Sequence, residues 1–414
     1  MKNILIISES YKFGGSGKAT QDIFSFFKKE FSTKILLPYI HKKDSSILNY
    51  YNFFNLCIYF FFKVYFRIIS YIFSRNKFYF FTNVFQHSLF SAKKIKKILK
   101  GFKPDYVIIL WHEYILNYKE ILKIKDILKV NIIIYPFDMH PFTGGCRYVQ
   151  SCNNYKNNCN NCPAIKLNGV ASKNFLSNKK TIREINPTFF FPSSFSLDFV
   201  SKTKILSKKI KKFKFYYPTI KKSYSTINKK KFLNYILLSK IKKKYINAVF
   251  FGAQDGMEWR KGIFFFNHTL NIFKNIYPEI YENTMFIYCG NSNHKLFIKP
   301  DSNIFIFDFL SYDEINKIYE LADIIVIPSL QEWSSYIMSE AFLLKKYIIC
   351  FETGSSKDFI KEGFNGNICD PYNFRYTAEK LYKFLNKKNK TKRKIKSLIT
   401  NINGNNMKVL SNFK

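Results

Sequence analysis

Short apolar runs alternate with segments of helical periodicity along most of this chain. Each run is followed by polar or glycine-bearing residues, where a loop would start. Strands of a parallel sheet read as such runs, because helices cover both faces of the sheet. The sequence therefore predicts an α/β fold with parallel sheets. The expected strands are Ile4–Ile7, Lys34–Leu37, Tyr106–Leu110, Asn131–Tyr135, Thr188–Phe191, Ala248–Phe251, Met285–Tyr288, Ile304–Phe307, Ile324–Ile327 and Tyr347–Cys350.

These strands form two series, one in each half of the chain. A chain of 414 residues is too long for one ordinary core and long enough for two. We therefore expect two Rossmann-like, doubly wound domains over residues 1–205 and 206–385, with the join near 200–215. The Lys- and Asn-rich residues 386–414 predict a basic C-terminal helix and then a poorly ordered tail. Ligands of such folds bind at the carboxyl ends of the strands.

The chain is strongly basic, with 67 Lys and Arg against 28 Asp and Glu and a net charge of +39. A field of this sign attracts nucleic acid, anionic lipid head groups or phosphorylated small molecules. An excess of Lys, Asn, Ile, Phe and Tyr also arises from AT-rich coding without selection for binding, so charge alone does not identify a partner. The sequence has no recognised nucleic-acid-binding motif and no concentrated basic helix, and we expect no nucleic acid partner.

The first ten residues, MKNILIISES, predict a buried strand rather than a signal peptide. One Lys precedes the apolar run, and Ser8, Glu9 and Ser10 end it without a small-residue cleavage site. We expect a cytoplasmic protein with reduced cysteines.

Residues 50–73 are apolar on all sides, and Lys63 and Arg67 are their only charges. The uncharged stretch is too short for a comfortable membrane span and is rich in Tyr. One interpretation is a helix in the membrane interface, with Lys and Arg at head-group level. The other is a helix packed between the sheet and its neighbours. We favour the first, which predicts peripheral association with an anionic membrane surface, on the inner face of the cytoplasmic membrane.

The most informative stretch runs from Pro328 to Phe342, after the expected strand Ile324–Ile327. Glu332 falls in the loop, a helix starts near Ser334 or Ser335, and Glu340 follows about a turn and a half later. Two carboxylates and the helix N-terminus thus come to one end of the sheet. Carboxylates accept hydrogen bonds from sugar or ribose hydroxyls, and backbone N–H groups hold phosphates. The alternative is that both glutamates are solvated surface residues.

This stretch resembles the C-terminal half of the retaining glycosyltransferases of family 4, which have the GT-B fold of two Rossmann-like domains facing across a cleft. Their pattern is a Pro-Ser loop, a Glu, seven residues, a Glu-Ala pair, a strand and a Gly-containing loop. Phe351–Asp358 and Gly363–Gly366 continue it in order, whereas Leu344–Tyr347 replaces the family's Gly-Thr-Pro turn. The resemblance implies that Glu340 binds the ribose and Glu332 lies near the donor sugar. Ser335 and Tyr336 belong to the same donor site.

Upstream, Phe251–Ala253 and Trp259–Gly262 resemble the donor-phosphate element of that family. Gly252 ends a strand and would let the chain turn sharply to leave room for a diphosphate. Lys261 matches the basic residue that neutralises the leaving nucleotide diphosphate. Ala253 stands where many members carry Arg, and we expect Arg260 to supply that charge.

Gly14 and Gly15 open a Gly-Gly-Ser-Gly segment that fits neither a Walker loop nor a dinucleotide fingerprint. Its glycines would let the backbone approach a ligand before a helix begins. The family has a Gly-Gly loop here, facing the cleft from the acceptor side.

A second distinctive stretch begins with Asp138 and contains Thr-Gly-Gly-Cys and, later, Cys-x-x-Cys-Pro. It resembles a subset of family 4 enzymes, many of which work in surface-polysaccharide assembly. Phe137 stands where the subset has a His that faces the sugar. We therefore predict Asp138 as the catalytic group, with His112 or His140 facing the cleft instead.

Four cysteines cluster at Cys146, Cys152, Cys159 and Cys162. A structural zinc site, buried free thiols and a pair of disulfides all fit their spacing. The resemblance implies no metal for catalysis, because GT-B enzymes generally need none.

The resemblance predicts transfer of a sugar, with retention, from a UDP- or GDP-sugar to a hydroxyl of a saccharide or lipid-linked saccharide. The pathway would be bacterial surface polysaccharide or lipopolysaccharide assembly. Lys261, Glu332 and Asp138 are the predicted catalytic residues. The alternatives are another GT-B enzyme such as an epimerase or phosphorylase, a nucleic-acid-binding basic protein, and a catalytically inactive GT-B scaffold at the membrane.

Overall fold

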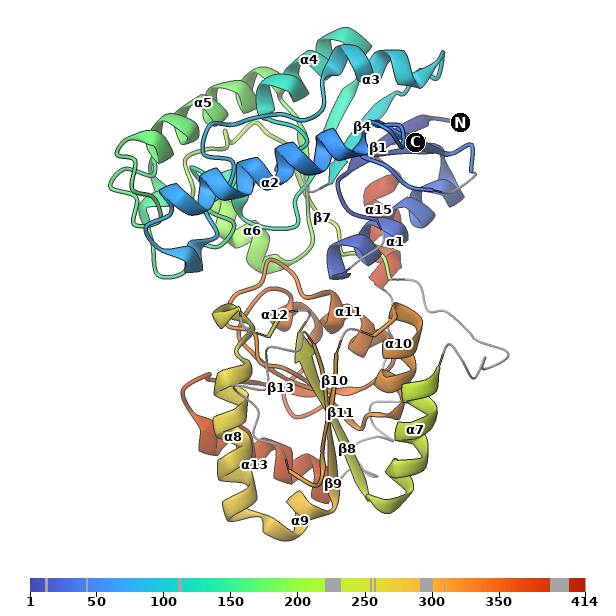
Figure 1. Cartoon of the computed structure of the whole chain (residues 1–414), viewed down its shortest axis with the longest axis vertical. Coiled ribbons are helices and arrows are strands. Elements are labelled where there is room, and N and C mark those ends of the chain that lie inside the picture. Colours follow the sequence, from blue (N-terminus) through green and yellow to red (C-terminus); the bar gives the residue numbers. More distant parts are fainter. Residues whose placement is uncertain are drawn as a thin grey trace. The chain divides into compact units, whose positions relative to one another are not determined.

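The computed structural model divides into two compact units (Figure 1). The first unit contains Met1–Pro218 and Ile402–Lys414, and the second contains Thr219–Asn401. The structure describes residues 1–11, 14–41, 44–110, 114–219, 232–253, 255–256, 258–290, 301–308, 310–387 and 402–413.

The described residues of the first unit build a seven-stranded, all-parallel sheet in the order β3-β2-β1-β4-β5-β6-β7. The chain leaves β1 in one direction along the sheet and returns to pair β4 on its other side, so β1 and β4 flank the switch point of a doubly wound fold. The strands are β1 Asn3–Ser8, β2 Ser32–Leu37, β3 Ile47–Asn49, β4 Tyr106–Leu110, β5 Asn131–Tyr135, β6 Thr188–Phe191 and β7 Lys212–Lys214.

Helices connect these strands, and several begin at caps that the sequence supplies. Ser91 and Asn117 accept hydrogen bonds from backbone N–H groups of the first turn, and Ser193 forms a capping box with Ser196. The helices are α1 Gly14–Glu30, α2 Leu56–Phe73, α3 Ala92–Leu99, α4 Tyr118–Leu128, α5 Val170–Ile185, α6 Ser194–Ser201 and α15 Ile402–Leu410, with short 3-10 turns at η1 Lys77–Tyr79, η2 His140–Phe142 and η3 Asn154–Lys156.

The second unit has a six-stranded parallel sheet in the order β10-β9-β8-β11-β12-β13, with its switch point between β8 and β11. Its strands are β8 Asn247–Ala253, β9 Thr284–Gly290, β10 Ile304–Phe307, β11 Ile324–Ile327, β12 Tyr347–Phe351 and β13 Gly366–Cys369. Its helices are α7 Leu233–Ile241, α8 Ile263–Ile276, α9 Pro278–Glu282, α10 Tyr312–Leu321, α11 Tyr336–Leu343, α12 Ser356–Phe359 and α13 Phe374–Asn386, with η4 Lys242–Lys244 and η5 Trp259–Lys261.

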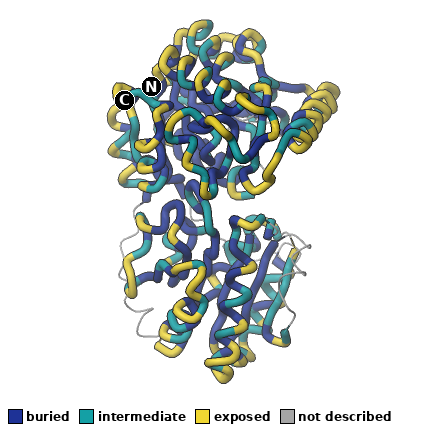
Figure 2. The backbone as a smooth tube through the Cα atoms, turned by 90° about the vertical axis from the view of Figure 1, so that its left-hand side faces the viewer, coloured by how far each residue is buried: buried dark blue, intermediate teal, exposed yellow. Residues whose placement is uncertain are grey.

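One aromatic-rich core joins α8 and α13 to the sheet of the second unit. Phe266 of α8 packs 4.8 Å from Phe251 of β8, and Phe384 of α13 stacks 4.2 Å from Tyr347 of β12, as ring-centroid distances. Figure 2 shows the strands of both units as buried segments beneath partly exposed helices. Burial of both sheet faces explains why the strands read as continuous apolar runs.

The predicted fold class is confirmed, and each expected strand is present with bounds that differ by two residues at most. Three strands were missed: β3, β7 and β13. Each has three or four residues and lies at an edge of its sheet, and β7 reads Lys-Phe-Lys, which is no apolar run.

The units also divide the chain differently from the predicted 1–205 and 206–385. The first unit extends to Pro218, because β7 pairs with β6 and continues its sheet. The end of the chain is not a loose tail, because Ile402–Leu410 forms α15 in the first unit. Asn406 Nδ2 donates to the carbonyl oxygen of Tyr216 at 2.8 Å, and the Phe413 ring lies 5.5 Å from that of Tyr106. The predicted helix between residues 388 and 401 lies outside the described residues.

Candidate active site

A buried cluster of opposite charges lies in the second unit, where the loop after β11 meets η5. Glu332 Oε1 is 2.6 Å from Lys261 Nζ and 3.2 Å from Arg260 Nη1. A second carboxylate, Glu258, lies 2.5 Å from Arg260 Nη2. Glu332 is 8% exposed and Arg260 is 7% exposed. Two cations and two carboxylates therefore neutralise each other, with Glu332 and Arg260 buried and Lys261 and Glu258 partly exposed.

Backbone contacts hold the two segments of this cluster together. The N–H of Leu330 donates to the carbonyl oxygen of Arg260 at 2.6 Å. Gly262 has φ +66°, and a Cβ there would lie 1.7 Å from the carbonyl oxygen of Pro328. Only glycine allows this approach, so the start of α8 is pressed against the end of β11. On the other side, the N–H of Glu332 donates to Thr353 Oγ1 at 2.7 Å.

The charges of the cluster set the protonation of its members. Burial raises the pKa of Glu332, but Lys261 and Arg260 outweigh burial and hold that pKa below its ordinary value. Glu332 is therefore ionised at neutral pH and accepts hydrogen bonds, so it is unsuited to act as a general acid. Burial and the charge of Arg260 lower the pKa of Lys261, while Glu332 and Glu258 oppose that shift.

The other predicted donor residues lie on α11 or just before it. Ser335 is the N-cap residue, one of the two positions expected, although within the described part of the chain its side chain makes no cap hydrogen bond. Tyr336 is buried, with its ring 6.4 Å from that of Tyr312. Glu340 is 5% exposed. The interpretation of Glu332 and Glu340 as solvated surface residues is therefore wrong, because both carboxylates are buried.

Gly252 has a different local role from the predicted one. It lies within β8, which continues to Ala253, and it pairs with Cys289 of β9. A Cβ at Gly252 would lie 2.4 Å from the carbonyl oxygen of Cys289. The close approach of the two strands, rather than a sharp turn, requires glycine at this position.

In the first unit, Asp138 lies just after β5 and is 2% exposed. Its Oδ1 accepts from the N–H of His140 at 3.0 Å, and its Oδ2 accepts from Arg147 Nε at 2.7 Å. Arg147 was not predicted from the sequence as the partner of Asp138. A single Arg directly after the Thr-Gly-Gly-Cys segment was a signal that a carboxylate nearby is buried and ion-paired. Asp138 thus anchors both ends of a loop.

His140 lines a small cavity of the first unit, of about 20 Å³. That volume is close to the space one water molecule needs. The other lining side chains are mostly amides, from Asn83, Gln86, Asn117, Asn174 and Asn178. The structure therefore brings His140 near amide groups, while the role of His140 toward an acceptor stays a prediction. His112 lies outside the described residues.

Three comparisons relate this geometry to known proteins. Residues 259–399 match the family model of glycosyl transferases group 1, and that span contains Arg260, Lys261, Glu332 and Glu340. No curated protein matches the chain in sequence. The solved structures named below align with this chain over 95–100% of its length. The fold is GT-B.

Three solved structures illustrate the similarity. The chain aligns with Anabaena Alr3699/HepE in complex with UDP-glucose at a TM-score of 0.60 and 10% identity, over 100% of this chain and 99% of that one. Sucrose-phosphate synthase from Thermosynechococcus elongatus gives 0.61 and 10%, over 100% and 98%. WaaG, a glycosyltransferase involved in lipopolysaccharide biosynthesis, gives 0.54 and 11%, over 95% and 93%. At such low identity the likeness concerns the GT-B fold.

The glycines of the Gly14–Gly15 and Thr-Gly-Gly-Cys segments have structural reasons of their own. Helix α1 begins at Gly14, so Gly14 and Gly15 form its first turn and not a loop before it. A Cβ at Gly144 would lie 2.3 Å from the carbonyl oxygen of Ala171, and one at Gly145 would lie 2.5 Å from the Phe81 ring. The Thr-Gly-Gly-Cys segment is therefore a tightly packed turn.

The four clustered cysteines belong to the same region, and all eight cysteines of the chain, which the structure describes, are free thiols. Cys146 and Cys162 are hydrogen-bonded to each other, and this bond lowers the pKa of Cys162 to about 7. The N–H of Gly144 lies 3.3 Å from Cys159 Sγ, and that of Asn154 lies 3.4 Å from Cys152 Sγ. Among the described residues, no group of three or more His, Cys, Asp or Glu is arranged to hold a metal ion.

Proposed function

We propose that this chain is a glycosyltransferase that moves a sugar from a nucleotide-diphosphate donor to a hydroxyl acceptor. The observation that carries the proposal is the buried cluster of Arg260, Lys261 and Glu332, which lies inside the residues that match the group 1 family. Negative charge grows on the diphosphate as its bond to the sugar breaks. Cations already held in position stabilise that charge without reorganisation, most strongly in a site with little water.

Each residue of the cluster has a role in this proposal. Lys261 and Arg260 face the diphosphate, and Glu332 and Glu258 hold them in place until it binds. Glu332, ionised at neutral pH, also accepts hydrogen bonds from hydroxyls of the donor sugar. Glu340 accepts from the ribose, at a helix whose N-terminal residues Ser335 and Tyr336 adjoin the phosphates.

The chemistry we propose proceeds with retention at the anomeric carbon. The bond from that carbon to the diphosphate oxygen breaks, and the acceptor oxygen bonds to the same face. The acceptor proton passes to the departing phosphate oxygen. The spacing of Glu332 and Glu340 supports this route, because it resembles the retaining family.

On the acceptor side we assign Asp138 together with His140, Gly14 and Gly15. Asp138 remains our predicted catalytic residue, and its bonds to Arg147 and to the His140 backbone support a role in shaping that loop. The acceptor we propose is a saccharide or a lipid-linked saccharide of bacterial surface polysaccharide or lipopolysaccharide assembly. The Thr-Gly-Gly-Cys segment and the fold shared with WaaG support this choice.

We favour a UDP-sugar over a GDP-sugar as donor, because HepE has the same fold in complex with UDP-glucose. A thermal-shift screen against UDP, GDP and their sugars tests both class and base. UDP compounds should raise the melting temperature most. If no nucleotide sugar shifts it and none is turned over, the proposed function fails and the inactive GT-B scaffold is the better account.

Substitution of the charged residues tests the site. Glu340→Ala and Lys261→Ala should each slow transfer by about a hundredfold or more, as expected when one charge-stabilising group is removed. Lys274→Ala is the matched control, because Lys274 also ion-pairs with a carboxylate of the second unit, Asp301, at 2.6 Å but at the surface. Near-normal rates for the two site variants would refute the assignment. The anomeric configuration of the product, read by NMR, tests retention separately.

A further inference from the structure

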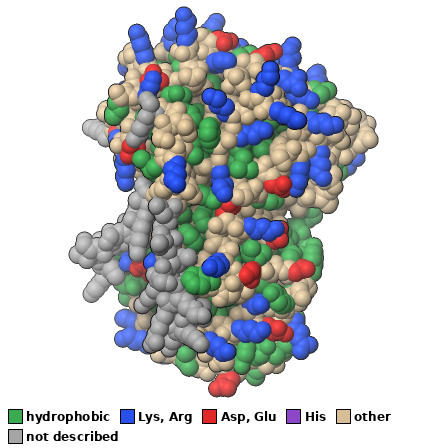
Figure 3. All heavy atoms as spheres, turned by 180° about the vertical axis from the view of Figure 1, so that it is seen from behind, with side chains coloured by type: hydrophobic (Ala, Val, Ile, Leu, Met, Phe, Trp, Pro, Cys, Tyr) green, Lys and Arg blue, Asp and Glu red, His purple; other side chains and the backbone are tan. Residues whose placement is uncertain are grey.

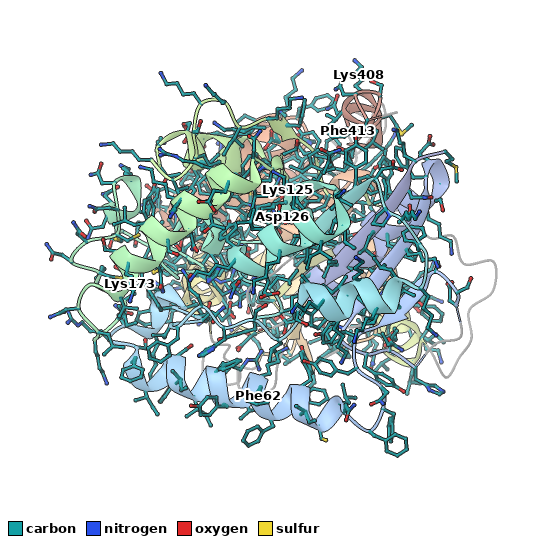
Figure 4. The ribbon with its side chains drawn as sticks, turned by 90° about the horizontal axis from the view of Figure 1, so that it is seen from above. Phe62, Lys125, Asp126, Lys173, Lys408 and Phe413 are labelled. Carbon is teal, nitrogen blue, oxygen red and sulfur yellow. The ribbon has the colours of Figure 1, made fainter. Side chains whose placement is uncertain are left out.

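Helix α2 exposes an unusually apolar surface. Of its 18 residues, all of which the structure describes, three are buried: Tyr59, Phe66 and Ser70. The described residues contain one helix long and apolar enough to cross a membrane, and it is α2. Figure 4 shows α2 along an edge of the first unit, with Phe62 among the side chains on it. The exposed apolar side chains of α2 are Ile58, Phe60, Phe61, Phe62, Val64, Tyr65, Ile68, Tyr71 and Ile72.

Contacts along its length hold α2 against the first unit. Tyr59 donates to Glu9 Oε1 at 3.1 Å, and Lys63 ion-pairs with the same carboxylate. The ring of Phe66 stacks on that of His87, with centroids 4.3 Å apart. If α2 crossed a bilayer, it would lose these contacts, and Lys63, the ion-pair partner of Glu9, would be buried in lipid. We therefore expect α2 to lie along a surface.

The buried and exposed sides of α2 face opposite directions. At 100° per residue, Tyr59, Phe66 and Ser70 fall within one narrow sector of the helix, whereas Phe61 and Ile68 point almost directly away from it. These two side chains are 67% and 52% exposed. The exposed face continues beyond the helix at Phe53, Phe54, Phe78 and Phe85, which are 68%, 83%, 54% and 50% exposed. Contiguous apolar patches of this extent mark protein or membrane contacts.

The segment that carries this face is also entirely free of acidic residues. Between residues 45 and 104 the sequence contains no Asp or Glu and ten Lys or Arg: Lys63, Arg67, Arg75, Lys77, Lys93, Lys94, Lys96, Lys97, Lys100 and Lys103. Elsewhere the signs are mixed, as on the face in Figure 3, where Asp and Glu are interspersed among Lys and Arg. Such a one-sided charge attracts an anionic surface.

Helix α3 concentrates this charge in a groove. Lys93, Lys94, Lys97 and Lys100 line the groove together with Ser91 and Ile98. The expectation that the chain lacks a concentrated basic helix is therefore wrong for α3. Residues 93–100 read KKIKKILK in the sequence, and the helical turn brings Lys93, Lys94, Lys97 and Lys100 to one side.

The lysine groove adjoins the start of α2. The N–H of Ser91 donates to the hydroxyl of Tyr50 at 2.9 Å, and Lys94 Nζ lies 4.9 Å from the centre of the Tyr51 ring. That ring lies 5.5 Å from the ring of Tyr59 on α2. The apolar face and the basic groove are thus neighbouring parts of one surface.

We propose that this surface, α2 with its flanking phenylalanines and the α3 lysines, docks onto an anionic phospholipid bilayer. The outward Phe and Ile side chains enter the interface between head groups and acyl chains, and the lysines contact lipid phosphates. A second copy of the chain fits this surface less well, because two segments without any acidic residue would face each other and repel. The inference concerns membrane attachment and does not depend on the proposed transfer reaction.

Vesicle flotation tests the apolar part of the proposal. The full chain should float with vesicles containing phosphatidylglycerol. Phe61→Ser/Ile68→Ser/Ile72→Ser should weaken partitioning by about a hundredfold, since three large apolar side chains no longer leave water. The matched control is Leu233→Ser/Leu237→Ser/Ile246→Ser in the second unit, whose side chains are 66%, 49% and 62% exposed. It should float like the unsubstituted chain, with circular dichroism verifying that both variants fold.

Charge substitutions test the basic part. Lys93→Gln/Lys97→Gln/Lys100→Gln should weaken binding to anionic vesicles by about a hundredfold and leave binding to phosphatidylcholine vesicles unchanged. Lys173→Gln/Lys180→Gln/Lys208→Gln removes the same charge elsewhere in the first unit and should have little effect. Binding to anionic vesicles should become less sensitive to salt concentration in the Lys93→Gln/Lys97→Gln/Lys100→Gln variant, and should keep its salt sensitivity in the control variant.

Three outcomes would overturn the proposal. The first is a chain that stays in the aqueous phase with both kinds of vesicle. The second is an equal loss of flotation in the α2 variant and its matched control. The third is a concentration-dependent dimer in analytical ultracentrifugation that the α2 variant abolishes while flotation is unaffected, which would make a second copy the occupant of this face.

Discussion

Gly262 joins the cation-bearing turn to the end of β11, and its replacement by alanine should disrupt the candidate site from the backbone. Its φ of +66° is costly for a residue with a Cβ, by about 1–2 kcal/mol. The added Cβ would also lie 1.7 Å from the carbonyl oxygen of Pro328. Because that neighbour is backbone, the two segments have to move apart by more than about 1 Å to reach ordinary contact.

Such a movement removes a further contribution to stability. The hydrogen bond from Leu330 N to Arg260 O, now 2.6 Å long, would stretch beyond the hydrogen-bonding range. Leaving these groups without partners costs about 1–3 kcal/mol. The total for Gly262→Ala is therefore about 2–5 kcal/mol. For a unit of this size, each kcal/mol lowers the melting temperature by about 2–4 °C, so we expect a decrease of roughly 4–20 °C.

Gly363→Ala is the control that separates the cost of the left-handed backbone conformation from the cost of the steric clash. Gly363 lies in the same unit with φ +68°, and a Cβ there would meet no described heavy atom within 4 Å. This variant should lose about 1–2 kcal/mol, or roughly 2–8 °C, from the left-handed conformation alone. Differential scanning calorimetry measures both, and UDP binding should survive in Gly363→Ala and fail in Gly262→Ala. Equal melting temperatures and equal UDP affinity in the two variants would refute the argument from close approach.

Three further predictions follow from the charges and thiols. The pKa of Glu332 is lowered in the folded chain, so its ion pairs stabilise the fold above the ordinary carboxyl pKa of 4.5 and are lost as pH falls through the folded pKa. The difference in melting temperature between the unsubstituted chain and Glu332→Gln should therefore shrink on acidification, whereas Glu320→Gln, at an exposed ion pair, should show little change. The pKa of Lys261 is lowered, so Lys261 loses its positive charge at a lower pH than an ordinary lysine does. The affinity for UDP, measured by calorimetry, should therefore begin to decrease at that lower pH; an affinity that stays constant up to the usual lysine range would contradict this. Cys162, with a pKa of about 7, should react with iodoacetamide at neutral pH well before Cys159, whose pKa burial raises to about 12, and equal rates by peptide mass spectrometry would count against the pairing with Cys146.

The sequence by itself determined ten of the described strands, five in each unit. Runs such as Tyr106–Leu110 and Ile324–Ile327 matched their strands to the residue, because a strand covered on both faces must be apolar throughout. Local rules also placed the start of α11 within one residue, at Ser334 or Ser335, and Glu332 in the loop before it. The edge strands escaped prediction, since a few residues such as those of β7 form a strand only when a neighbour offers its backbone for pairing.

Only the tertiary structure decided which side chains meet. Lys261 and Glu332 are 71 residues apart in the chain, and no local pattern predicts that their charges neutralise each other at 2.6 Å. The return of α15 to the first unit likewise depends on contacts with distant residues such as Tyr216. Residues 56–73 are another example, because the sequence of an apolar helix does not show whether the helix is buried in the protein or exposed on its surface. The fold left most of that helix uncovered, since the sheet and its loops hold it by one narrow side.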